Sequence, residues 1–420
     1  MPATRRALLT AGLASAASLP AFALPTAARA AAVVTPAAVT AEPLSFGALF
    51  PFSGSLSLLG DESFRGLDLA TDERNAGGGL LGRPVKLVRG DAADPDRAAG
   101  ETKRLLEQAK AGLLFGTYSS VVSFAASAIS ELAGAPYFEL DALADPITER
   151  GFKLLYRSGP LASACGVLSI DTLADTLAPA WQIDPAALKI ALLHEDGLAG
   201  VAVSDAQVLR CKERGLTLAE RIAYVATTMD YAPLVQRLRG AGADVVLHTG
   251  HASDVVLFHR AMKLAGWRPR MVIGAGGGYS LNDTAQSLGA DFEGVLNVDV
   301  TQYRVAEAVA PGAAEVAAAY QRKYGAPPRS GHSLVCFAGA RLFFDVVQRA
   351  GGLDHDKLRA AALATDLPPK STAGGWGVKF DDKGQNTRAV PYLTQWQKGE
   401  LVTVAPKDAA VAPLVPMLGS

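Results

Sequence analysis

The stretch that decides the fold runs from Ser45 to Asp91 and reads SFGALFPFSGSLSLLGDESFRGLDLATDERNAGGGLLGRPVKLVRGD. The apolar segment Phe46–Phe50 predicts a short strand, which the following proline ends. From about Asp61 apolar residues recur at helical spacing, and the glycines after Asn75 predict the end of that helix. A second apolar segment, Val85–Val88, comes next. Strand, helix and strand in this order predict a βαβ unit and therefore a parallel α/β sheet.

The same alternation continues through the chain in two series. The first series ends near residue 157, and the second begins with a helix after Ser163. Each series predicts one doubly wound lobe. Further strands are expected at 112–116, 135–138, 154–157, 189–193, 218–224, 244–248, 271–273 and 294–298, and helices at 94–111, 163–177, 201–214, 231–239, 253–265, 312–324 and 331–351.

Several ordered motifs carry a family resemblance. In the first stretch they are Pro51-x-Ser-Gly, Gly60, Arg65-Gly66, Asn75-x-Gly-Gly and Gly82-Arg-Pro. With them the chain resembles the branched-chain amino acid-type, Leu/Ile/Val-binding-protein-like solute-binding proteins of bacterial ABC importers. The similarity extends almost to the C-terminus, through Asp145–Gly151, Tyr324-Gly-Ala-Pro-Pro and Phe380–Gly384.

This resemblance implies a type I periplasmic binding protein fold. In that fold two doubly wound, Rossmann-like α/β lobes are joined by a three-strand hinge. The N-terminal lobe is expected to comprise residues 44–160 plus 300–376, and the C-terminal lobe residues 161–299 plus 377–420.

The first 30 residues predict an export signal. They contain Arg5-Arg6, an Ala/Leu-rich core and the small-x-small site Ala28-Arg29-Ala30. The twin arginines favour a twin-arginine signal cleaved after Ala30, and an ordinary Sec signal is the alternative. Either signal delivers the protein to the periplasm. Residues 31–43, rich in Ala, Pro and Thr, are interpreted as a flexible leader.

Composition excludes several functional classes. The 420 residues are 49% hydrophobic and 19% charged, which suits one large or two medium globular domains. Without residues 1–30, 40 basic residues less three leave 37 against 41 acidic ones. A mildly acidic chain without basic tracts is a poor candidate for nucleic-acid binding. Three widely spaced cysteines, an odd number, leave at least one unpaired, and Cys211 and Cys336 are interpreted as buried apolar residues.

The resemblance also places the binding site. In open α/β sheets ligands bind beyond the carboxyl ends of the strands, so two facing lobes predict an interlobe cleft. Ser120 stands where the family binds the ligand's carboxylate, although a serine there can also cap the following helix. His251 lies near a family tyrosine, with an ordinary loop histidine as the alternative. The expected ligand-binding residues are Tyr118, Ser119, Ser120, Asp141, Ala142, Leu143, Ala199, His251 and Gly276.

Three of these positions depart from the family's pattern. Leu143 replaces a threonine, and Ala199 replaces an aromatic residue, which implies a roomier pocket. Gly276 replaces the acid that holds the ammonium group of an amino acid. Asp141, with Glu139, could bind an ammonium group instead, or these acids are capping or hinge residues and the ligand is an amine-free carboxylate or aromatic compound. The second alternative is favoured slightly.

Enzymatic function has little support. Gly-x-Ser-x-Gly and Gly-x4-Gly-Lys-Ser/Thr are absent, and Tyr279 replaces the third glycine of a dinucleotide fingerprint. His248-x-x-His251 with Asp254 is a weak zinc candidate because no second ligand pair accompanies it. We therefore expect a monomeric, non-enzymatic binding protein without cofactor or metal that closes on a small molecule and presents it to an ABC permease. A module that senses the ligand for a membrane receptor is the alternative, and a hydrolase is a more remote one.

Overall fold

The strand β1 (Leu44–Phe50) lies at the centre of the first lobe and pairs in parallel with strands on both sides. The computed structural model describes residues 42–418, so the predicted signal peptide and most of the predicted leader lie outside the described residues. The first sheet has the order β2-β1-β3-β4-β5, and all its pairs are parallel, as predicted. Its other strands are β2 (Val85–Asp91), β3 (Leu114–Gly116), β4 (Tyr137–Glu139) and β5 (Leu155–Arg157).

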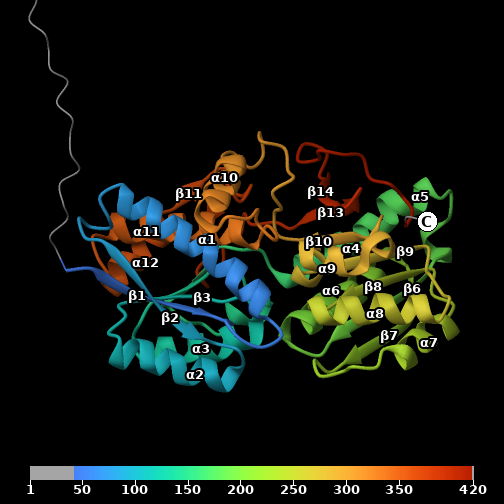
Figure 1. Ribbon diagram of the computed structural model, residues 1–420, viewed down its shortest axis with the longest axis horizontal. Helices are drawn as coiled ribbons and strands as arrows, with labels where there is room; N and C mark the ends of the chain where they lie inside the picture. The colour runs from blue at the N-terminus through green and yellow to red at the C-terminus, as the bar shows by residue number, and fades with distance from the viewer. Residues whose placement is uncertain (1–41, 419–420) are drawn as a thin grey trace, which may run out of the picture. The chain divides into compact units, whose positions relative to one another are not determined.

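Side chains of β1 alternate between two helical layers. Phe46, Ala48 and Phe50 belong to a core shared with α1 (Ser57–Ala76) and α11 (His332–Ala350). Leu49 points the other way, into a core shared with α2 (Pro95–Lys103) and α3 (Ser120–Leu132). Figure 1 shows α1 and α11 on one side of this sheet and α2 and α3 on the other. The helix α1 begins at Ser57, earlier than predicted, because a turn at Gly54 already directs the chain into it.

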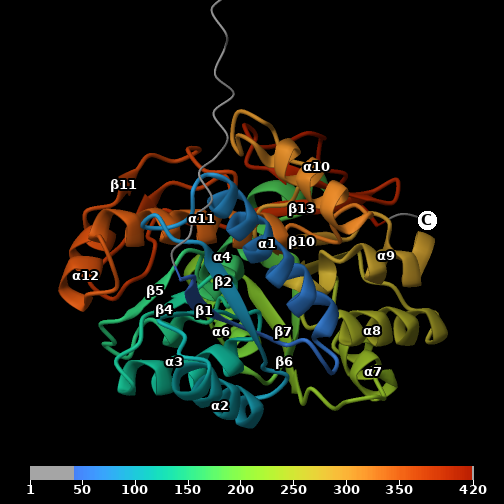
Figure 2. The same cartoon turned by 60° about the vertical axis from the view of Figure 1, so that its left-hand side comes forward.

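The second lobe contains a seven-stranded sheet of order β14-β13-β10-β9-β8-β6-β7. Its strands from β10 to β7 pair in parallel, and β13 and β14 are antiparallel additions. Ile190 and Leu192 face α4 and α6, whereas Ala191 and Leu193 face α7 and α8. Figure 2 shows α7, α8 and α9 gathered beside one another. The bounds are β6 Lys189–Glu195, β7 Thr217–Tyr224, β8 Val245–Thr249, β9 Met271–Ala275, β10 Leu296–Asp299, β13 Tyr392–Gln397 and β14 Glu400–Ala405, with α4 Ala162–Thr172, α6 Leu198–Arg214, α7 Ala232–Gly240, α8 Ala252–Leu264 and α9 Asn282–Leu288.

The chain passes between the lobes three times, after β5, after β10 and before β13. After the second passage, α10 (Ala313–Tyr324), α11 and α12 (His355–Leu363) pack on the first lobe. The third passage comes later than residue 376. β12 (Val378–Lys379) pairs with β11 (Asp366–Leu367), and Phe380 packs against Tyr156 and Phe343 of the first-lobe core. The apolar side chains of Val378 and Phe380 therefore keep this segment with the first lobe.

Arg157 joins two of these passages. Its Nε donates to Gln385 Oε1 at 2.6 Å, and its Nη1 donates to the carbonyl oxygens of Ala142 and Ala144. The side chain is fully buried, and burial lowers the pKa of its guanidinium to about 10. The hinge is thus held by a buried charge whose donors reach backbone carbonyls.

The three cysteines, Cys165, Cys211 and Cys336, are all buried and form no disulfide. Burial of Cys211 and Cys336 confirms their interpretation as core residues. Within residues 42–418, none of the helices has the length and apolar character needed to cross a membrane.

Candidate functional site

The carboxyl ends of parallel strands from both sheets meet at one cavity of about 370 Å³. Loops after β1 to β4 form its first-lobe wall, and loops after β6 to β9 form its second-lobe wall. This is the place that the doubly wound architecture predicts for a ligand. The lining residues are Ser55, Leu56, Ala93, Asp94, Pro95, Tyr118, Ser119, Ser120, Val121, Val122, Asp141, Leu143, Glu195, Asp196, Gly197, Leu198, Ala199, Ala226, Thr249, Gly250, His251, Ser253, Asp254, Ala275, Gly276, Gly277 and His332.

The structure brings eight of the nine expected ligand-binding residues to this cavity. They are Tyr118, Ser119, Ser120, Asp141, Leu143, Ala199, His251 and Gly276. Ala142 is the exception and does not line the cavity. Its amide donates to Glu139 Oε1 at 2.8 Å and its carbonyl accepts from Arg157, so both of its backbone polar groups already have partners within the protein. The local turn after β4 therefore directs Ala142 away from the ligand.

The first-lobe wall presents the N-terminus of α3. The first N–H groups of a helix have no acceptor within the helix, and the helix dipole makes this end attractive to anions. Ser119, Ser120, Val121 and Val122 all line the cavity here. Ser119 makes no side-chain capping bond, whereas Ser120 Oγ accepts from the Ala144 amide at 3.2 Å. The hydroxyl of Ser119 and the free amides form a site suited to a carboxylate.

Three neighbouring helices that begin at the cavity already have their own carboxylates. Asp94 caps α2 by accepting from Arg97 N at 2.8 Å. Glu195 accepts from Gly197 N and Gly200 N at the start of α6. Asp254 accepts from His251 N at 2.9 Å at the start of α8. These amides are therefore engaged, which distinguishes the start of α3 from them.

Tyr118 reaches from the first lobe to the second. Its hydroxyl lies 3.4 Å from His251 Nδ1, and its ring meets the ring of His332 edge to face. Burial, and then the negative charges of nearby carboxylates, raise the pKa of Tyr118 well above its ordinary value. The carboxylates are Asp299, Asp141, Glu195 and Asp254. Tyr118 thus lies in a strongly acidic environment.

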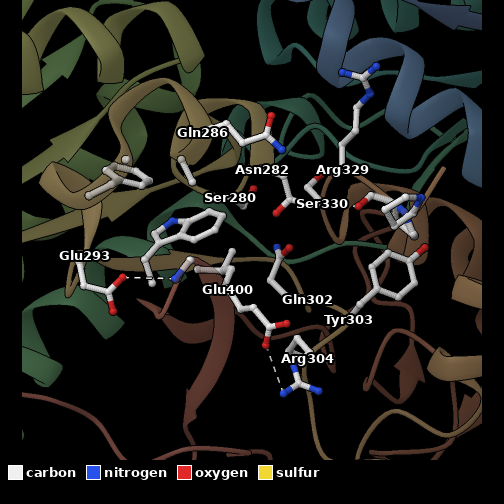
Figure 3. Close-up of a pocket in the computed structure, with 18 of the residues that line it drawn as sticks. Ser280, Asn282, Gln286, Glu293, Gln302, Tyr303, Arg304, Arg329, Ser330 and Glu400 are labelled. Carbon is white, nitrogen blue, oxygen red and sulfur yellow. Dashed lines mark hydrogen bonds and ion pairs between the residues drawn. The ribbon is translucent and has the colours of Figure 1, made fainter.

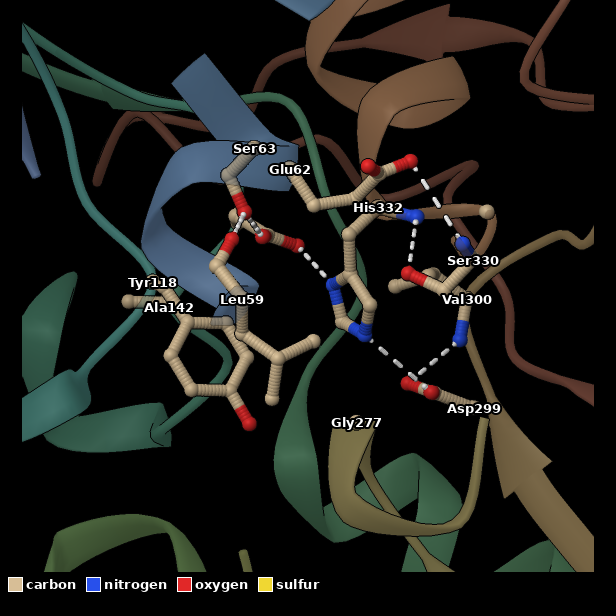
Figure 4. Close-up of polar contacts among 12 residues, drawn as sticks. Leu59, Glu62, Ser63, Tyr118, Ala142, Gly277, Asp299, Val300, Ser330 and His332 are labelled. Atoms are coloured by element: carbon tan, nitrogen blue, oxygen red, sulfur yellow. Dashed lines mark hydrogen bonds and ion pairs between the residues drawn. The ribbon is translucent and has the colours of Figure 1, made fainter. Parts of the chain in front are cut away.

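A buried histidine bridges two carboxylates at the edge of the cavity. His332 Nδ1 lies 2.7 Å from Asp141 Oδ1, and His332 Nε2 lies 3.3 Å from Asp299 Oδ2. Figure 4 shows a dashed line from each ring nitrogen of His332, one of them ending at Asp299. Burial alone lowers the pKa of His332, but the two carboxylates outweigh burial and raise this pKa well above the ordinary value. The two carboxylates therefore favour the imidazolium form of His332.

Both carboxylate oxygens of Asp141 have partners within the protein. One carboxylate oxygen meets His332, and the other accepts from Ser63 Oγ at 2.5 Å. Glu139 is buried away from the cavity and accepts from the amides of Thr117, Asp141 and Ala142. Burial raises the pKa of Glu139 to about 7. The hydrogen bonds of both acids thus indicate that these two side chains organise the protein and do not bind an ammonium group.

Acids dominate the charged groups of the cavity wall. Asp94, Asp141, Glu195, Asp196 and Asp254 line it. Among the described residues that line this cavity there is no lysine or arginine, and the carboxylates beside His332 favour its cationic form. Sequence reasoning did not single out Glu195, Asp196 or His332 as site residues, and it named Asp254 only in the weak zinc candidate. Glu195, Asp196 and Asp254 lie at or after the ends of second-lobe strands and could have been found by that position, but no local signal connects His332 with the cleft.

His248, the first residue of the weak zinc candidate, is a core histidine. His248 Nε2 lies 2.9 Å from Tyr224 Oη, and His248 Nδ1 lies 2.7 Å from Tyr279 Oη. Both ring nitrogens thus have tyrosine partners, and burial lowers the pKa of His248 well below its ordinary value. No cluster of metal-binding side chains occurs in residues 42–418.

A second, larger hollow of about 700 Å³ lies elsewhere (Figure 3). It is lined by α9, by β13 and β14, and by the segments 302–304 and 327–330. Arg304 and Glu400, which form an ion pair at 3.4 Å, lie at its edge. Both of its strands are the antiparallel additions, so the hollow lacks the convergence of parallel strand ends that marks the interlobe cavity. We do not assign the ligand to it.

Comparisons with known proteins agree with this fold. A family model described as periplasmic binding protein matches residues 43–400. The chain is 45% identical over 370 residues to Leu/Ile/Val-binding protein homolog 8 of Brucella abortus, covering 88% of this chain and 92% of that protein.

Solved structures show the same fold at low sequence identity. A leucine-binding protein of Thermotoga maritima matches with TM-score 0.76 and 19% identity over 86% of this chain and 98% of that one. A solute-binding protein of an ABC transporter from R. palustris, in complex with benzoate, matches with TM-score 0.74 and 21% identity over 89% and 98% of the two chains.

Proposed function

The chain belongs to the periplasmic binding protein family, and from that premise we propose that it is the solute-binding component of an ABC importer for a small zwitterion, an amino acid or a close derivative. This family consists of periplasmic binding proteins, not enzymes. The observation that carries the choice of ligand is the charge pattern of the cavity, in which the uncapped N-terminus of α3 faces a wall of acids.

The carboxylate of the ligand binds at the start of α3. There it accepts hydrogen bonds from the free amides and from Ser119, in a site that the protein's own acids leave open. The structural relatives include one named for leucine and one holding benzoate, both carboxylates. A carboxylate end is therefore common to the two ligand classes that these relatives suggest.

The acidic wall selects an amino acid over an amine-free carboxylate. Burying a further anion among Asp141, Glu195 and Asp254 is unfavourable unless the ligand also brings a cation, because these acids outnumber His332, which already pairs with Asp141. An ammonium group on the ligand compensates these charges. Gly276 still leaves the usual acid missing. The ammonium group therefore binds at the second-lobe wall near Asp196, because Glu195 and Asp254 already accept hydrogen bonds from backbone amides.

Binding brings the two lobes together around the ligand. Both walls contribute contacts, so the ligand favours the conformation in which it touches both. The protein then presents the ligand to an inner-membrane permease, and a monomer suffices for this task. Cleavage of a twin-arginine signal after Ala30 accounts for its export. The mass of the periplasmic protein tests the cleavage site. A variant with Arg5→Lys and Arg6→Lys tests the export route, and it is expected to stay in the cytoplasm.

A matched set of ligands tests the function. Thermal unfolding of the protein from Ala31 onward is measured with leucine, leucinamide, 4-methylpentanoate, 3-methylbutylamine and benzoate. Leucine is expected to raise the unfolding temperature most, because it alone satisfies both walls; at a thousand times Kd the added stability is about 4 kcal/mol. If 4-methylpentanoate or benzoate raises the unfolding temperature more than leucine does, the proposal of a zwitterionic ligand is wrong. The proposed carboxylate site at the start of α3 would still hold.

A further inference from the structure

We propose that His332 is a positioning residue for ligand binding, which holds the two lobes in their closed arrangement through paired contacts with Asp141 and Asp299. The proposal rests on the proposed function, because it concerns the closure that makes the binding cavity. It concerns residues far apart in the chain: Asp141 and His332 are separated by 191 positions.

The two carboxylates belong to different lobes. Asp141 follows β4 of the first sheet, and Asp299 ends β10 of the second. His332 begins α11, which packs on the first lobe. The contact between His332 Nε2 and Asp299 Oδ2 therefore crosses from one lobe to the other.

This contact is deeply buried, and its two atoms have no alternative polar partners among the described residues. The side chains of His332, Asp141 and Asp299 are at most 2% exposed. Neither Asp299 Oδ2 nor His332 Nε2 makes a hydrogen bond among the described residues, so the ion-pair contact between them, at 3.3 Å, is the polar contact that each atom has. A buried ionised carboxylate without a partner is costly, so each of these atoms depends on the other.

The two contacts require a doubly protonated ring. A neutral imidazole has one N–H donor and one lone pair, so it can donate to Asp141 or to Asp299 but not to both. With the neutral ring, one buried carboxylate faces a lone pair. Loss of the proton therefore weakens the link between the lobes, and the closed arrangement is expected to lose population as pH rises.

Other groups around His332 do not replace either carboxylate. Tyr118 packs its ring against His332 from the loop before α3, and Ser63 of α1 acts through Asp141. Glu62 bonds Ser333 and Tyr320. The titratable and charged groups facing the cluster are Asp141, Asp299 and Tyr118, with Glu62, Cys336 and Cys165 behind them.

The same cluster packs tightly across the cleft. A Cβ atom on Gly277 of the second lobe would lie 2.8 Å from His332 Nε2 and 2.8 Å from Tyr118 Oη. In Figure 4, Gly277 lies below the ring of His332, close to Asp299. The imidazolium thus meets both a charge and a closely fitting backbone on the opposite lobe.

The test measures lobe separation without any ligand. Spin labels are attached through Leu132→Cys in the first lobe and Met229→Cys in the second, which are 89% and 75% exposed, whereas the three native cysteines are buried. Pulsed electron paramagnetic resonance then gives the distribution of distances between the labels at several pH values. Because no ligand is added, failure of the ligand screen and failure of this proposal are distinguishable.

The labelled protein is expected to show a short-distance population at neutral pH that declines at alkaline pH. His332→Gln should reduce the ratio of closed to open molecules about tenfold or more and should abolish the pH dependence. Asp299→Asn, which leaves the ring and the first-lobe pair intact, should shift the distribution in the same direction. His355→Gln, a histidine on α12 outside the cleft, is the matched control and should change neither.

Three results would overturn the proposal. One is a wild-type distribution without a short-distance population. Another is a folded His332→Gln protein with the wild-type distribution and pH profile. If His332→Gln does not fold, an unchanged distribution in Asp299→Asn rejects the interlobe link by itself.

Discussion

Gly277 of the second lobe packs so closely on His332 of the first that a Cβ atom at position 277 would lie 2.8 Å from His332 Nε2. The backbone of Gly277 does not have positive φ, so an alanine fits the second lobe considered alone. The need for glycine therefore arises only when the lobes meet.

Gly277→Ala is expected to lower ligand affinity while leaving the stability of the ligand-free protein nearly unchanged. The added methyl group must displace His332 or Tyr118 in the closed state, at a cost of about 1–3 kcal/mol, which is about tenfold or more in Kd. Calorimetric titration with the ligand found by screening measures the affinity, and thermal unfolding measures the stability.

The neighbouring Gly276→Ala is the matched control. Gly276 has φ +91°, and a Cβ there would meet no atom within 4 Å. This variant should lose about 1–2 kcal/mol of folding stability through backbone strain, without the steric block to closure. Equal affinity losses in both variants would contradict the interlobe explanation.

The two serines at the start of α3 are expected to differ. Ser119→Ala removes a hydroxyl that makes no capping bond, so it should weaken ligand binding about tenfold or more and leave the ligand-free protein as stable as before. Ser120→Ala also deprives the Ala144 amide of its acceptor, so it should cost about 1 kcal/mol of folding stability as well. If Ser119→Ala binds the ligand with unchanged affinity, this hydroxyl does not contribute to the carboxylate site.

Glu139 should make folding stability depend on pH. Its pKa rises from 4.5 to about 7 on folding, chiefly through burial. Between these values the folded protein holds a proton that the unfolded chain has released, so stability falls as pH rises across this window, by about 3 kcal/mol in total.

Glu139→Gln tests this dependence because glutamine imitates the protonated acid. Its carbonyl can accept from the amides of Thr117, Asp141 and Ala142, and its NH2 group can donate to Ser123 Oγ. Denaturant unfolding at several pH values should show a flatter profile for the variant between pH 4.5 and 7. Parallel profiles for variant and wild type would assign the dependence to another group.

Arg157 should be essential to the hinge. Replacing it with methionine leaves the carbonyl oxygen of Ala142 and the side-chain oxygen of Gln385 without their buried donor. We expect a loss of about 3 kcal/mol or more in folding stability, measured by denaturant unfolding. Arg157→Lys should recover little, because one ammonium group cannot reproduce the fork of the guanidinium.

The exposed interlobe pair of Arg329 and Asp283 is the comparison for Arg157. Its nitrogen and oxygen are 2.8 Å apart, but both side chains are about one-third exposed. Arg329→Ala should therefore cost under about 1 kcal/mol, because water screens the pair. A loss as large as that of Arg157→Met would show that burial is not the deciding difference.

The sequence by itself determined the parallel sheets, the two series of strands and helices, and the strand ends that surround the cavity. These follow from local rules: Phe46, Ala48 and Phe50 alternate with Gly47 and Leu49, and polar residues such as Ser119 follow a buried strand. A strand or helix must bury one face, and that requirement is visible in a few consecutive residues.

Only the tertiary structure decided which side chains meet across the cleft. It turned Ala142 away from the cavity, kept Phe380 with the first lobe and brought His332 to Asp299. These outcomes depend on how residues distant in the chain compete for the same buried space and the same donors. The periodicity of apolar residues in the sequence contains no information on that competition. Its outcome is decided only when the lobes pack.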